Sequence, residues 1–384
     1  MSPSPKRTKA NPVTVLVVGA VREEMYDNLN SYPFKIYASF CLTHPSLATV
    51  VAVCESNAKR QSNFALRHKI EPKNVLSDYK QITKGLAQCA VVSTLDQSHA
   101  DIVVHLASLG YHILCEKPWP FMRQAVLKAG VLFACGHVLR YSPYTRALQS
   151  VLRSGEIGDI INVVHVEPVQ FRMVPFCPSF VRGNWRNEAE TSFSLMTKCA
   201  KRVSSFGSLT HFKKSQKPKE AGDAKNCLDC SISSSCPYSA TSLYITQAHL
   251  VVSKLRDGQY GACVYEIPDN DVCDHQVTAS LTMVAFTESV CQRATRIHGT
   301  KGEIIGDMST FTVFDFGSKV KRTVDPAKTD VDGDGDSGLM HAFIRAVATG
   351  DQSLLGCDVN DVFESHRLVF AAEEARLKGT VVSL

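Results

Sequence analysis

A lysine and a histidine each stand just after a short apolar run in the first half of the chain. Glu116-Lys117 follows the run His112–Cys115, and His137 comes shortly after the run Val131–Cys135. Apolar runs of this length are typical of buried parallel strands. In open α/β sheets, ligands bind just beyond the carboxyl ends of the strands. An ammonium and an imidazole at that edge can act on a bound molecule, whereas the simpler interpretation is an ordinary solvated strand end.

Further runs of the same kind indicate the sheet that would position these groups. Strands alternating with helices predict a parallel, doubly wound sheet, and therefore an α/β fold with a Rossmann-type N-terminal domain. The expected strands are Val13–Val18, Ala48–Cys54 and Ala90–Ser93 together with the two runs above, and the expected helices include Lys59–His68, Tyr79–Leu86 and Ala100–Leu109.

The first two strands end in the layout of a dinucleotide site. Gly19-Ala20 closes the first strand and Glu55 closes the second, where a carboxylate can accept hydrogen bonds from the adenosine ribose. Arg60 could instead meet a 2′-phosphate, so the pattern leaves NAD and NADP both open. The glycine turn is incomplete, because Val21 stands where the second glycine of G-x-G-x-x-G belongs.

The whole set of motifs resembles the Gfo/Idh/MocA family of NAD(P)-dependent oxidoreductases, from about Val13 to the C-terminus. The motifs that carry the resemblance are Gly19, VVAVCE ending at Glu55, TLDQSH at 94–99, GYHILCEKP at 110–118, GHVLRYSPY at 136–144, GEIGDI at 155–160, FVRGNW at 180–185, GTKGEI at 299–304 and GDSGLM at 335–340.

The resemblance implies a fold of two domains. We expect a flexible basic tail over 1–11, a Rossmann domain over 12–142, and a C-terminal substrate and oligomerisation domain over 143–384. The second domain would be an α/β domain with a large, mostly antiparallel open sheet, through which the family often forms homo-oligomers. Clear alternation of apolar and polar residues after Ile160 agrees with strands that have one solvated face. The last helices would pack back on the core.

The resemblance also implies roles for particular residues. Lys117 would contact both cofactor and substrate hydroxyl, and it is the predicted catalytic residue. The cofactor, NAD or NADP, would be bound by Gly19, Ala20, Glu55, Arg60, Thr94, Asp96, His99, Glu116 and His137. The substrate, a sugar-like or small alcohol or ketone, would be bound by Arg140, Tyr141, Arg182 and Trp185.

The chain departs from the family where the catalytic helix of the second domain is expected. That helix typically carries a His and an Asp after a Lys-Cys pair, but here SFSLMTKC at 192–199 runs directly into Ala200-Lys201-Arg202. A general acid or base contributes roughly 10²–10⁴-fold to a rate. The alternative function is therefore a catalytically impaired member that acts as a nucleotide-binding or regulatory protein.

Cysteines are frequent, and one group of them has the spacing of metal ligands. Cys227, Cys230 and Cys236 form C-x₂-C-x₅-C and could hold zinc if a fourth ligand joined them. No His or Cys follows at short spacing, so we favour a structural loop and predict no metal. Most of the other cysteines lie singly in apolar runs, where a free thiol behaves as a small hydrophobe.

Composition limits the partners of the chain. The net charge of +5 over 384 residues is small, and no basic stripe with interleaved aromatic residues is present, so we expect no nucleic acid. No apolar run reaches the ~18 residues of a membrane span, and we expect no membrane partner. The predicted partner is a small-molecule substrate, and the predicted location is the cytoplasm.

Overall fold

The computed structural model describes most of the chain. The described residues are 11–19, 37–117, 122–168, 182, 202–203, 205–209, 212–236, 238–245, 255–256, 259–270, 275–278, 281–284, 293–328 and 335–383. They divide into two compact units, the first comprising Met1–Ser142 and Asp332–Phe363 and the second Pro143–Val331 and Glu364–Leu384.

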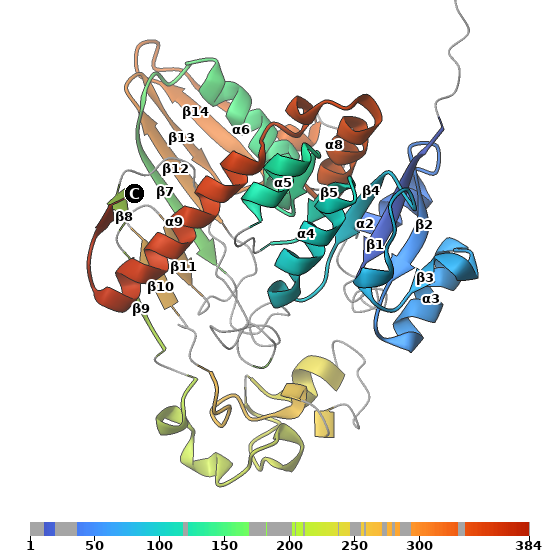
Figure 1. The fold of residues 1–384 in the computed structure, drawn as a ribbon. Coiled ribbons are helices and arrows are strands. Elements are labelled where there is room, and N and C mark those ends of the chain that lie inside the picture. The colour runs from blue at the N-terminus through green and yellow to red at the C-terminus, as the bar shows by residue number, and fades with distance from the viewer. Residues whose placement is uncertain are drawn as a thin grey trace, which may run out of the picture. The chain divides into compact units, whose positions relative to one another are not determined.

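The first unit contains a parallel sheet of six strands (Figure 1). Its order is β3-β2-β1-β4-β5-β6, in which the chain runs outward from β1 in both directions. This order confirms the predicted doubly wound Rossmann sheet. The strands are β1 (Val13–Val18), β2 (Ala48–Cys54), β3 (Val75–Leu76), β4 (Cys89–Val92), β5 (His112–Cys115) and β6 (Phe133–Cys135).

Helices cover both faces of this sheet because successive strand residues point to opposite sides. In β1, Val15 and Val17 pack in one cluster with α2 and α8, whereas Leu16 and Val18 pack in another with α4 and α5. The strands are therefore buried on both faces, which explains their continuous apolar sequences. The helices are α2 (Tyr37–Thr43), α3 (Ala58–His68), α4 (His99–Ser108), α5 (Arg123–Ala129) and α8 (Gly335–Thr349).

The helix predicted over Tyr79–Leu86 is wrong. Only a 3-10 turn forms, at Tyr79–Gln81, where Asp78 and Gln81 make a reciprocal capping box. Beyond it the Tyr111 hydroxyl donates to the Thr83 carbonyl at 2.6 Å and accepts from the Leu86 N–H at 3.1 Å. These bonds occupy backbone groups that a helix would need for itself.

A later segment of the first unit, which includes Gln352 and Leu355, is hydrogen-bonded to the outer edge of β6 and to the residues after it. The Gln352 side chain accepts from the Phe133 N–H at 3.0 Å and donates to the Phe133 carbonyl at 2.9 Å, as a neighbouring strand would. The buried Tyr141 hydroxyl donates to the Leu355 carbonyl at 3.0 Å. The backbone N–H and carbonyl of Phe133 on this edge strand are therefore not available to another chain.

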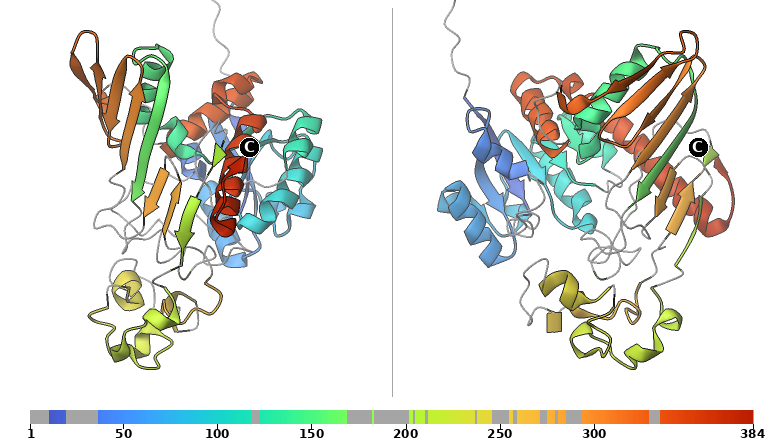
Figure 2. Two further views of the ribbon diagram at one scale, coloured as in Figure 1. Left: turned by 90° about the vertical axis from the view of Figure 1, so that its left-hand side faces the viewer. Right: turned by 180° about the vertical axis from the view of Figure 1, so that it is seen from behind.

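The second unit contains an eight-stranded sheet in the order β15-β14-β13-β12-β7-β11-β10-β9 (Figure 2). Its neighbouring strands are antiparallel except for β11 and β7, so the predicted large, mostly antiparallel sheet is confirmed. The strands are β7 (Ile160–Pro168), β9 (Ser205–Ser208), β10 (His275–Thr278), β11 (Leu281–Val284), β12 (Ala294–Gly299), β13 (Gly302–Gly306), β14 (Phe311–Asp315) and β15 (Lys321–Val324).

One face of this sheet packs on helix α6 (Pro143–Arg153). Tyr144 and Val151 of that helix share a buried cluster with Ile297, Ile304 and Phe311 of the sheet. Burial alternates along β12, as expected for a strand with one solvated face. Helix α9 (Val359–Lys378) begins in the first unit and continues in the second, and a two-stranded sheet joins β8 (Arg202–Val203) to β16 (Val382–Ser383).

Short turns complete both units. The 3-10 turns of the first are η1 (Pro72–Asn74), η2 (Tyr79–Gln81), η3 (Asp96–Ser98), η4 (Val138–Tyr141) and η13 (Gln352–Leu355). Those of the second are η7 (Lys214–Gln216), η8 (Lys219–Ala221), η9 (Cys227–Asp229), η11 (Gln259–Gly261) and η12 (Pro326–Lys328), with a π-helical turn η10 at Thr241–Ile245.

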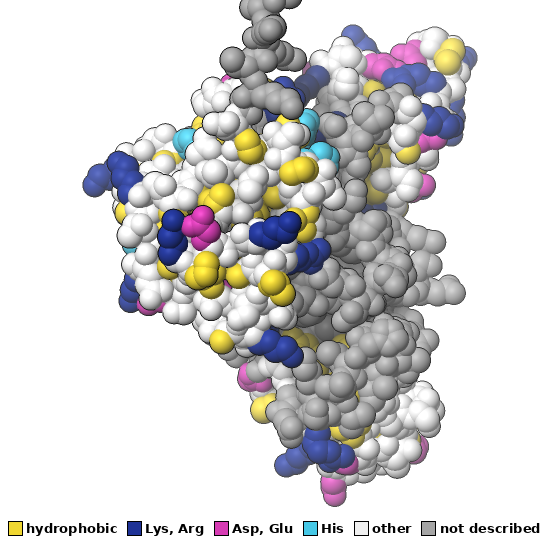
Figure 3. All heavy atoms as spheres, turned by 90° about the vertical axis from the view of Figure 1, so that its right-hand side faces the viewer, with side chains coloured by type: hydrophobic (Ala, Val, Ile, Leu, Met, Phe, Trp, Pro, Cys, Tyr) yellow, Lys and Arg dark blue, Asp and Glu magenta, His cyan; other side chains and the backbone are white. Residues whose placement is uncertain are grey.

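On the face drawn in Figure 3, Lys and Arg side chains are spread among apolar and uncharged surface. Among the described residues, no helix combines the length and apolar character that crossing a membrane requires.

Candidate functional site

The carboxyl ends of five strands in the first unit are aligned in one row. Cys54 is the register partner of Val18, Val18 of Val92, Val92 of Cys115, and Cys115 of Cys135. These are the last residues of β2, β1, β4, β5 and β6. The residue that follows each of them therefore lies at a single edge of the sheet, where α/β proteins bind ligands.

Backbone hydrogen bonds fix the next row of residues. The N–H groups of Gly19, Ser93, Glu116 and Gly136 each donate, at 2.9 Å, to the carbonyl of the last residue in the adjacent strand. The N–H of Glu55 donates to the Leu76 carbonyl at 2.9 Å. Of the residues predicted to bind the cofactor, Gly19, Glu55 and Glu116 are thus brought together by the strand register alone.

Gly19 marks the point where the strand order reverses, between β1 and β4. It has φ of 87°, in the region that only glycine adopts freely, and a Cβ there would lie 2.8 Å from Thr94 Cγ2 and 2.9 Å from Thr94 N. The Ser93 hydroxyl also donates to the Gly19 carbonyl at 2.6 Å. Two predicted cofactor residues, Gly19 and Thr94, are therefore in close contact at the switch point of the sheet.

Glu55 lies on the other side of β1, at the end of β2. Only 4% of it is exposed, and its Oε1 accepts from the Asn57 N–H at 2.8 Å. Asn57 in turn caps helix α3 by accepting from the Arg60 N–H at 3.0 Å. The carboxylate is thus held at the strand end next to the N-terminus of a helix, which favours negative charge.

The segment from Thr94 to His99 is held by its own side chains. His99 Nε2 lies 3.1 Å from the Thr94 carbonyl oxygen, and the Ser98 hydroxyl donates to Thr94 Oγ1 at 2.8 Å. Asp96 begins the turn η3 and is partly exposed. His99 is fully buried, so it fixes the shape of this segment from inside and presents no open surface.

Glu116 has a partner that the sequence did not reveal. The Tyr37 hydroxyl, at the start of α2, donates to Glu116 Oε1 at 2.6 Å, and both residues are buried. Gly136 leaves the space for this carboxylate, because a Cβ at Gly136 would lie 2.9 Å from Glu116 Cδ. The sequence indicates only that Tyr37 belongs to an apolar segment, YASFCLT, and it does not indicate the partner of its hydroxyl.

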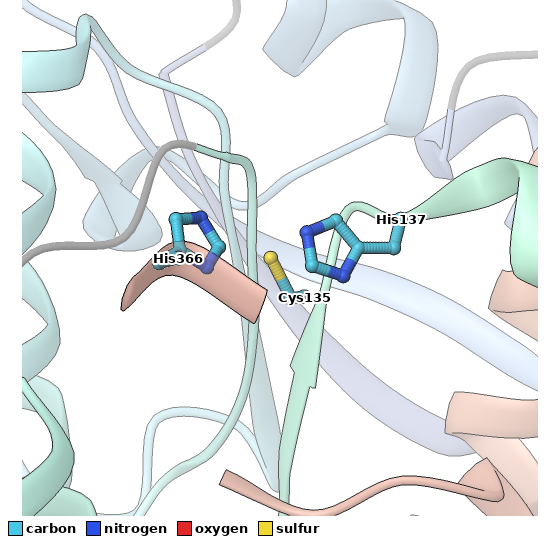
Figure 4. A group of neighbouring side chains, drawn as sticks. All are labelled: Cys135, His137 and His366. Carbon is cyan, nitrogen blue, oxygen red and sulfur yellow. The ribbon is translucent and has the colours of Figure 1, made fainter. Parts of the chain in front are cut away.

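Lys117 and His137 follow β5 and β6, and both are partly buried. Figure 4 shows the Cys135 side chain at the end of β6 and the His137 side chain on the segment after it. The Cys135 sulfur and a ring nitrogen of His137 lie within 4.8 Å of each other. His366, also labelled there, belongs to α9 in the second unit. Burial and the Glu116 charge raise the pKa of the Cys135 thiol, an effect that the Lys117 charge partly offsets.

Burial raises the thiol pKa of two cysteines at the strand ends, Cys54 and Cys115. Burial, with smaller contributions from Asp78 and Glu55, raises the pKa of Cys54 to about 12. Burial also raises the pKa of Cys115 well above its ordinary value. The thiolate is the reactive form, so neither thiol is a nucleophile near neutral pH. This agrees with their interpretation as small core residues.

Three of the residues predicted to bind substrate donate hydrogen bonds to backbone carbonyls. Arg140 donates to the Gly356 carbonyl at 2.5 Å, and Tyr141 is buried with its hydroxyl bonded to the Leu355 carbonyl. Arg182 is fully buried in the second unit and donates to the carbonyls of Ala262 and Tyr238. In these positions the three side chains support the packing of the fold. Ala20, Trp185 and the segment 192–199 lie outside the described residues.

Together, the sheet order and the aligned strand ends define a Rossmann-type fold in the first unit, and the second unit has an open, mostly antiparallel sheet. A family model described as an oxidoreductase family with an NAD-binding Rossmann fold matches residues 32–129. This is the model of the Gfo/Idh/MocA family, which the chain resembles over these residues.

Similar proteins include several dehydrogenases and reductases. Trans-1,2-dihydrobenzene-1,2-diol dehydrogenase of Bos taurus is 32% identical over 126 residues, covering 31% of this chain and 37% of the relative. 1,5-Anhydro-D-fructose reductase of Ensifer adhaerens is 28% identical over 148 residues, covering 36% and 41%. The matched stretch therefore spans well under half the length of these curated relatives.

Solved structures match along nearly the whole chain. Levoglucosan dehydrogenase in complex with NADH and levoglucosan has a TM-score of 0.66 at 17% identity, covering 97% of this chain and 99% of that one. An aldose-aldose oxidoreductase from Caulobacter crescentus complexed with glycerol has a TM-score of 0.65 at 15% identity, covering 97% and 100%. At this level of identity the likeness concerns the fold.

Proposed function

We propose that this protein is an NAD-dependent oxidoreductase that transfers a hydride between the nicotinamide and a sugar-like or small alcohol or ketone substrate. The observation that carries the proposal is the row of groups at the carboxyl edge of the sheet, with Gly19 against Thr94 at the switch point and Glu55 at the end of β2. Similar proteins that act on sugars and diols support the substrate class.

The residues at this edge fit a dinucleotide. Glu55 offers carboxylate oxygens to ribose hydroxyls, and the absence of a Cβ at Gly19 lets β1 end against Thr94. We favour NAD over NADP because the Glu55 carboxylate would repel a 2′-phosphate. Arg60, whose N–H is used to cap α3, is the residue that would favour NADP instead.

Lys117 is the residue we propose for catalysis. When bound, a nicotinamide supplies or accepts the hydride. The Lys117 ammonium, one residue beyond Glu116 at the end of β5, would donate a hydrogen bond to the substrate oxygen and stabilise negative charge that develops there. Thr94, Asp96 and His137 belong to the same strand ends and would shape the cleft around the cofactor. Arg140 and Tyr141 would hold the segment after β6 in place behind it.

Cofactor binding is the first test of this function. Titration of the purified protein with NADH and with NADPH, followed by nucleotide fluorescence and by the melting temperature, is expected to give saturable binding that is tighter for NADH. A response to neither nucleotide would contradict the proposal. Tighter binding of NADPH would instead indicate that Arg60 binds the 2′-phosphate of the cofactor.

The second candidate function is nucleotide binding without turnover. It is favoured by the sequence at 192–199, which passes into Ala200-Lys201-Arg202 without the family's His and Asp. A panel of sugars, polyols and diols, assayed for NADH formation at 340 nm by absorbance, separates the two functions. NADH binding with no oxidation of any panel member would favour the binding protein.

We further propose that the protein forms homo-oligomers through the outer face of the eight-stranded sheet and resides in the cytoplasm. Val164 and Ile305 are both 38% exposed, and each is a register partner of Arg296, so they share one row of that face. Light scattering of the purified protein is expected to give a mass above one chain, and Ile305→Lys is expected to lower it. A monomer at all concentrations would contradict this proposal.

A further inference from the structure

Four cysteines of the second unit lie in one small region with its own core. Cys227, Cys230 and Cys236 are close in sequence, whereas Cys263 follows much later in the chain. Cys227 and Cys263 are buried, and Cys230 and Cys236 are partly exposed. All four are free thiols. The sequence spacing of the first three suggested metal ligands but offered no fourth, and the structure places Cys263 close to Cys227.

Backbone pairing holds Cys263 beside Cys227. The Cys263 N–H donates to the Lys225 carbonyl at 2.8 Å, and Asn226 forms a β-bridge with Ala262. The Cys227 thiol lies 3.9 Å from the Ala262 carbonyl oxygen. The two buried cysteines therefore come from adjacent backbone segments, as in metal sites that tie a loop to a distant part of the chain.

Consecutive turns fold the other two cysteines back toward this pair. The Ser233 N–H donates to the Cys230 carbonyl at 3.0 Å, and the Cys236 N–H donates to the Ile232 carbonyl at 2.9 Å. Cys236 packs against the apolar cluster that contains Cys227 and Cys263. The turns therefore keep the four cysteines in one small region of the second unit.

A buried cation lies against the group. Arg182 is fully buried, and its Nη2 donates to the Cys227 sulfur at 3.5 Å and to the Tyr238 carbonyl at 2.6 Å. A divalent zinc ion with four thiolates has a net charge of about −2, since each thiolate contributes one negative charge. A guanidinium in contact with one sulfur offsets part of that charge in a region of low dielectric.

The apolar core of this region is small and separate from those of the two sheets. Apart from two of the cysteines, it consists of Phe212, Tyr238, Ala240, Tyr244, Leu255, Val264 and Tyr265, and none of these belongs to the clusters beneath either sheet. Small cores of this kind often depend on a structural metal or a disulfide for their stability.

We propose that Cys227, Cys230, Cys236 and Cys263 bind a structural zinc ion that stabilises this region of the second unit. Among the described residues, no three of these sulfurs lie within 4.8 Å of one another, and tetrahedral coordination at Zn–S distances of about 2.3 Å requires closer approach. Cys230 and Cys236 are the partly exposed members, and the proposal requires their side chains to rotate toward the two buried thiols when the metal binds.

Metal content of the purified full-length protein is the first test. Protein expressed with added zinc, then dialysed against metal-free buffer, is expected to retain about one zinc ion per chain by mass spectrometry of the metal. A mercurial that reacts with thiols should release that zinc to a colorimetric chelator. Retention of less than about a tenth of an ion per chain would overturn the proposal, as would a disulfide between any two of the four cysteines in peptide mass spectra.

Variants assign the zinc to the four cysteines. Cys230→Ser is expected to lower the zinc content at least several-fold, whereas Cys357→Ser is expected to leave it unchanged. Cys357 is a matched control, because it is also a partly buried free cysteine but belongs to the first unit. Equal zinc contents in the two variants would contradict the assignment.

Cobalt substitution keeps the test valid if Cys230→Ser fails to fold. Replacement of zinc by Co²⁺ in the unaltered protein should give the intense visible bands of a tetrahedral tetrathiolate site. An octahedral spectrum, or none, would contradict the proposal. Nucleotide binding by the first unit provides an independent reading, since the dinucleotide proposal does not depend on whether zinc is bound.

Discussion

The Tyr37 hydroxyl donates a hydrogen bond of 2.6 Å to the buried carboxylate of Glu116. Glu116 directly precedes Lys117 at the end of β5, so this bond helps to set the position of the proposed catalytic lysine. Gly136, at the end of the neighbouring strand, leaves the room that the carboxylate occupies. Three residues from separate parts of the sequence thus cooperate to place one strand end.

Tyr37→Phe is expected to destabilise the protein by about 1–3 kcal/mol, because a buried carboxylate would lose a donor. Urea denaturation would measure the change. Tyr79→Phe is the control, since its hydroxyl makes no hydrogen bond among the described residues, and it should leave the free energy of unfolding nearly unchanged. Equal stability of the two variants would show that the Tyr37 bond contributes nothing.

Gly19→Ala is expected to cost more stability than Gly85→Ala. Both glycines have φ near 85°, at 87° and 84°, so both substitutions introduce the same backbone strain. Only at Gly19 would the added Cβ meet other atoms, those of Thr94, whereas nothing lies within 4 Å at Gly85. The difference, about 1–3 kcal/mol by analogy with overpacked cores, is measurable by thermal or urea denaturation. Similar losses in the two variants would contradict a tight contact at the switch point.

Glu55→Gln is expected to weaken NADH binding about tenfold, because the charged acceptor for ribose hydroxyls is lost. The amide oxygen of Gln can still accept from the Asn57 N–H, so the strand end should keep its shape. Fluorescence titration measures the dissociation constant. Glu71→Gln removes an exposed carboxylate that pairs with Lys73, and it should leave NADH affinity unchanged. An unaltered affinity in Glu55→Gln would place the ribose elsewhere.

Lys117→Ala is expected to lower turnover roughly 10²–10³-fold, the usual effect of removing one group that stabilises developing charge. NADH affinity should fall much less, so kcat is the informative constant. Lys128→Ala changes an exposed lysine of α5 and serves as the control. Unchanged turnover in Lys117→Ala would remove Lys117 from the catalytic role.

Glu167 of the second unit is expected to stabilise the protein in a pH-dependent manner. Burial alone would raise its pKa, but hydrogen bonds from His165 and from Arg293, whose Nε lies 2.7 Å from Oε2, lower the pKa below its ordinary 4.5. A lowered pKa in the folded protein gives stability that is present above the unfolded value and is lost as the pH falls through the folded value.

The corresponding variant is Glu167→Gln. It should be less stable than the unaltered protein at pH 7, by about 1–3 kcal/mol, and the difference should shrink as the pH falls from 4.5 through the lowered pKa of Glu167. Urea denaturation at a series of pH values measures this. A difference that does not vary with pH would contradict the ion pair as its cause.

The sequence by itself determined five of the six strands of the first unit, all except the two-residue β3, and the groups at their ends. Continuous apolar runs specify strands that are buried on both faces, and the run at 48–54 ends at the residue where β2 ends. Because parallel strands in one register end in one row, the positions of Gly19, Glu55 and Glu116 after their runs were enough to predict a shared edge.

Tertiary structure decided the contacts between residues that no local pattern connects. The bond of Tyr37 to Glu116, the placement of Cys263 beside Cys227 and the burial of Arg182 all join segments that are distant in sequence. Tyr111 likewise prevented the helix expected after Tyr79 by bonding its backbone groups. Periodicity reports which face of an element is apolar, whereas these partners are selected only when the whole chain packs, because hydrogen bonding and burial depend on neighbours in space.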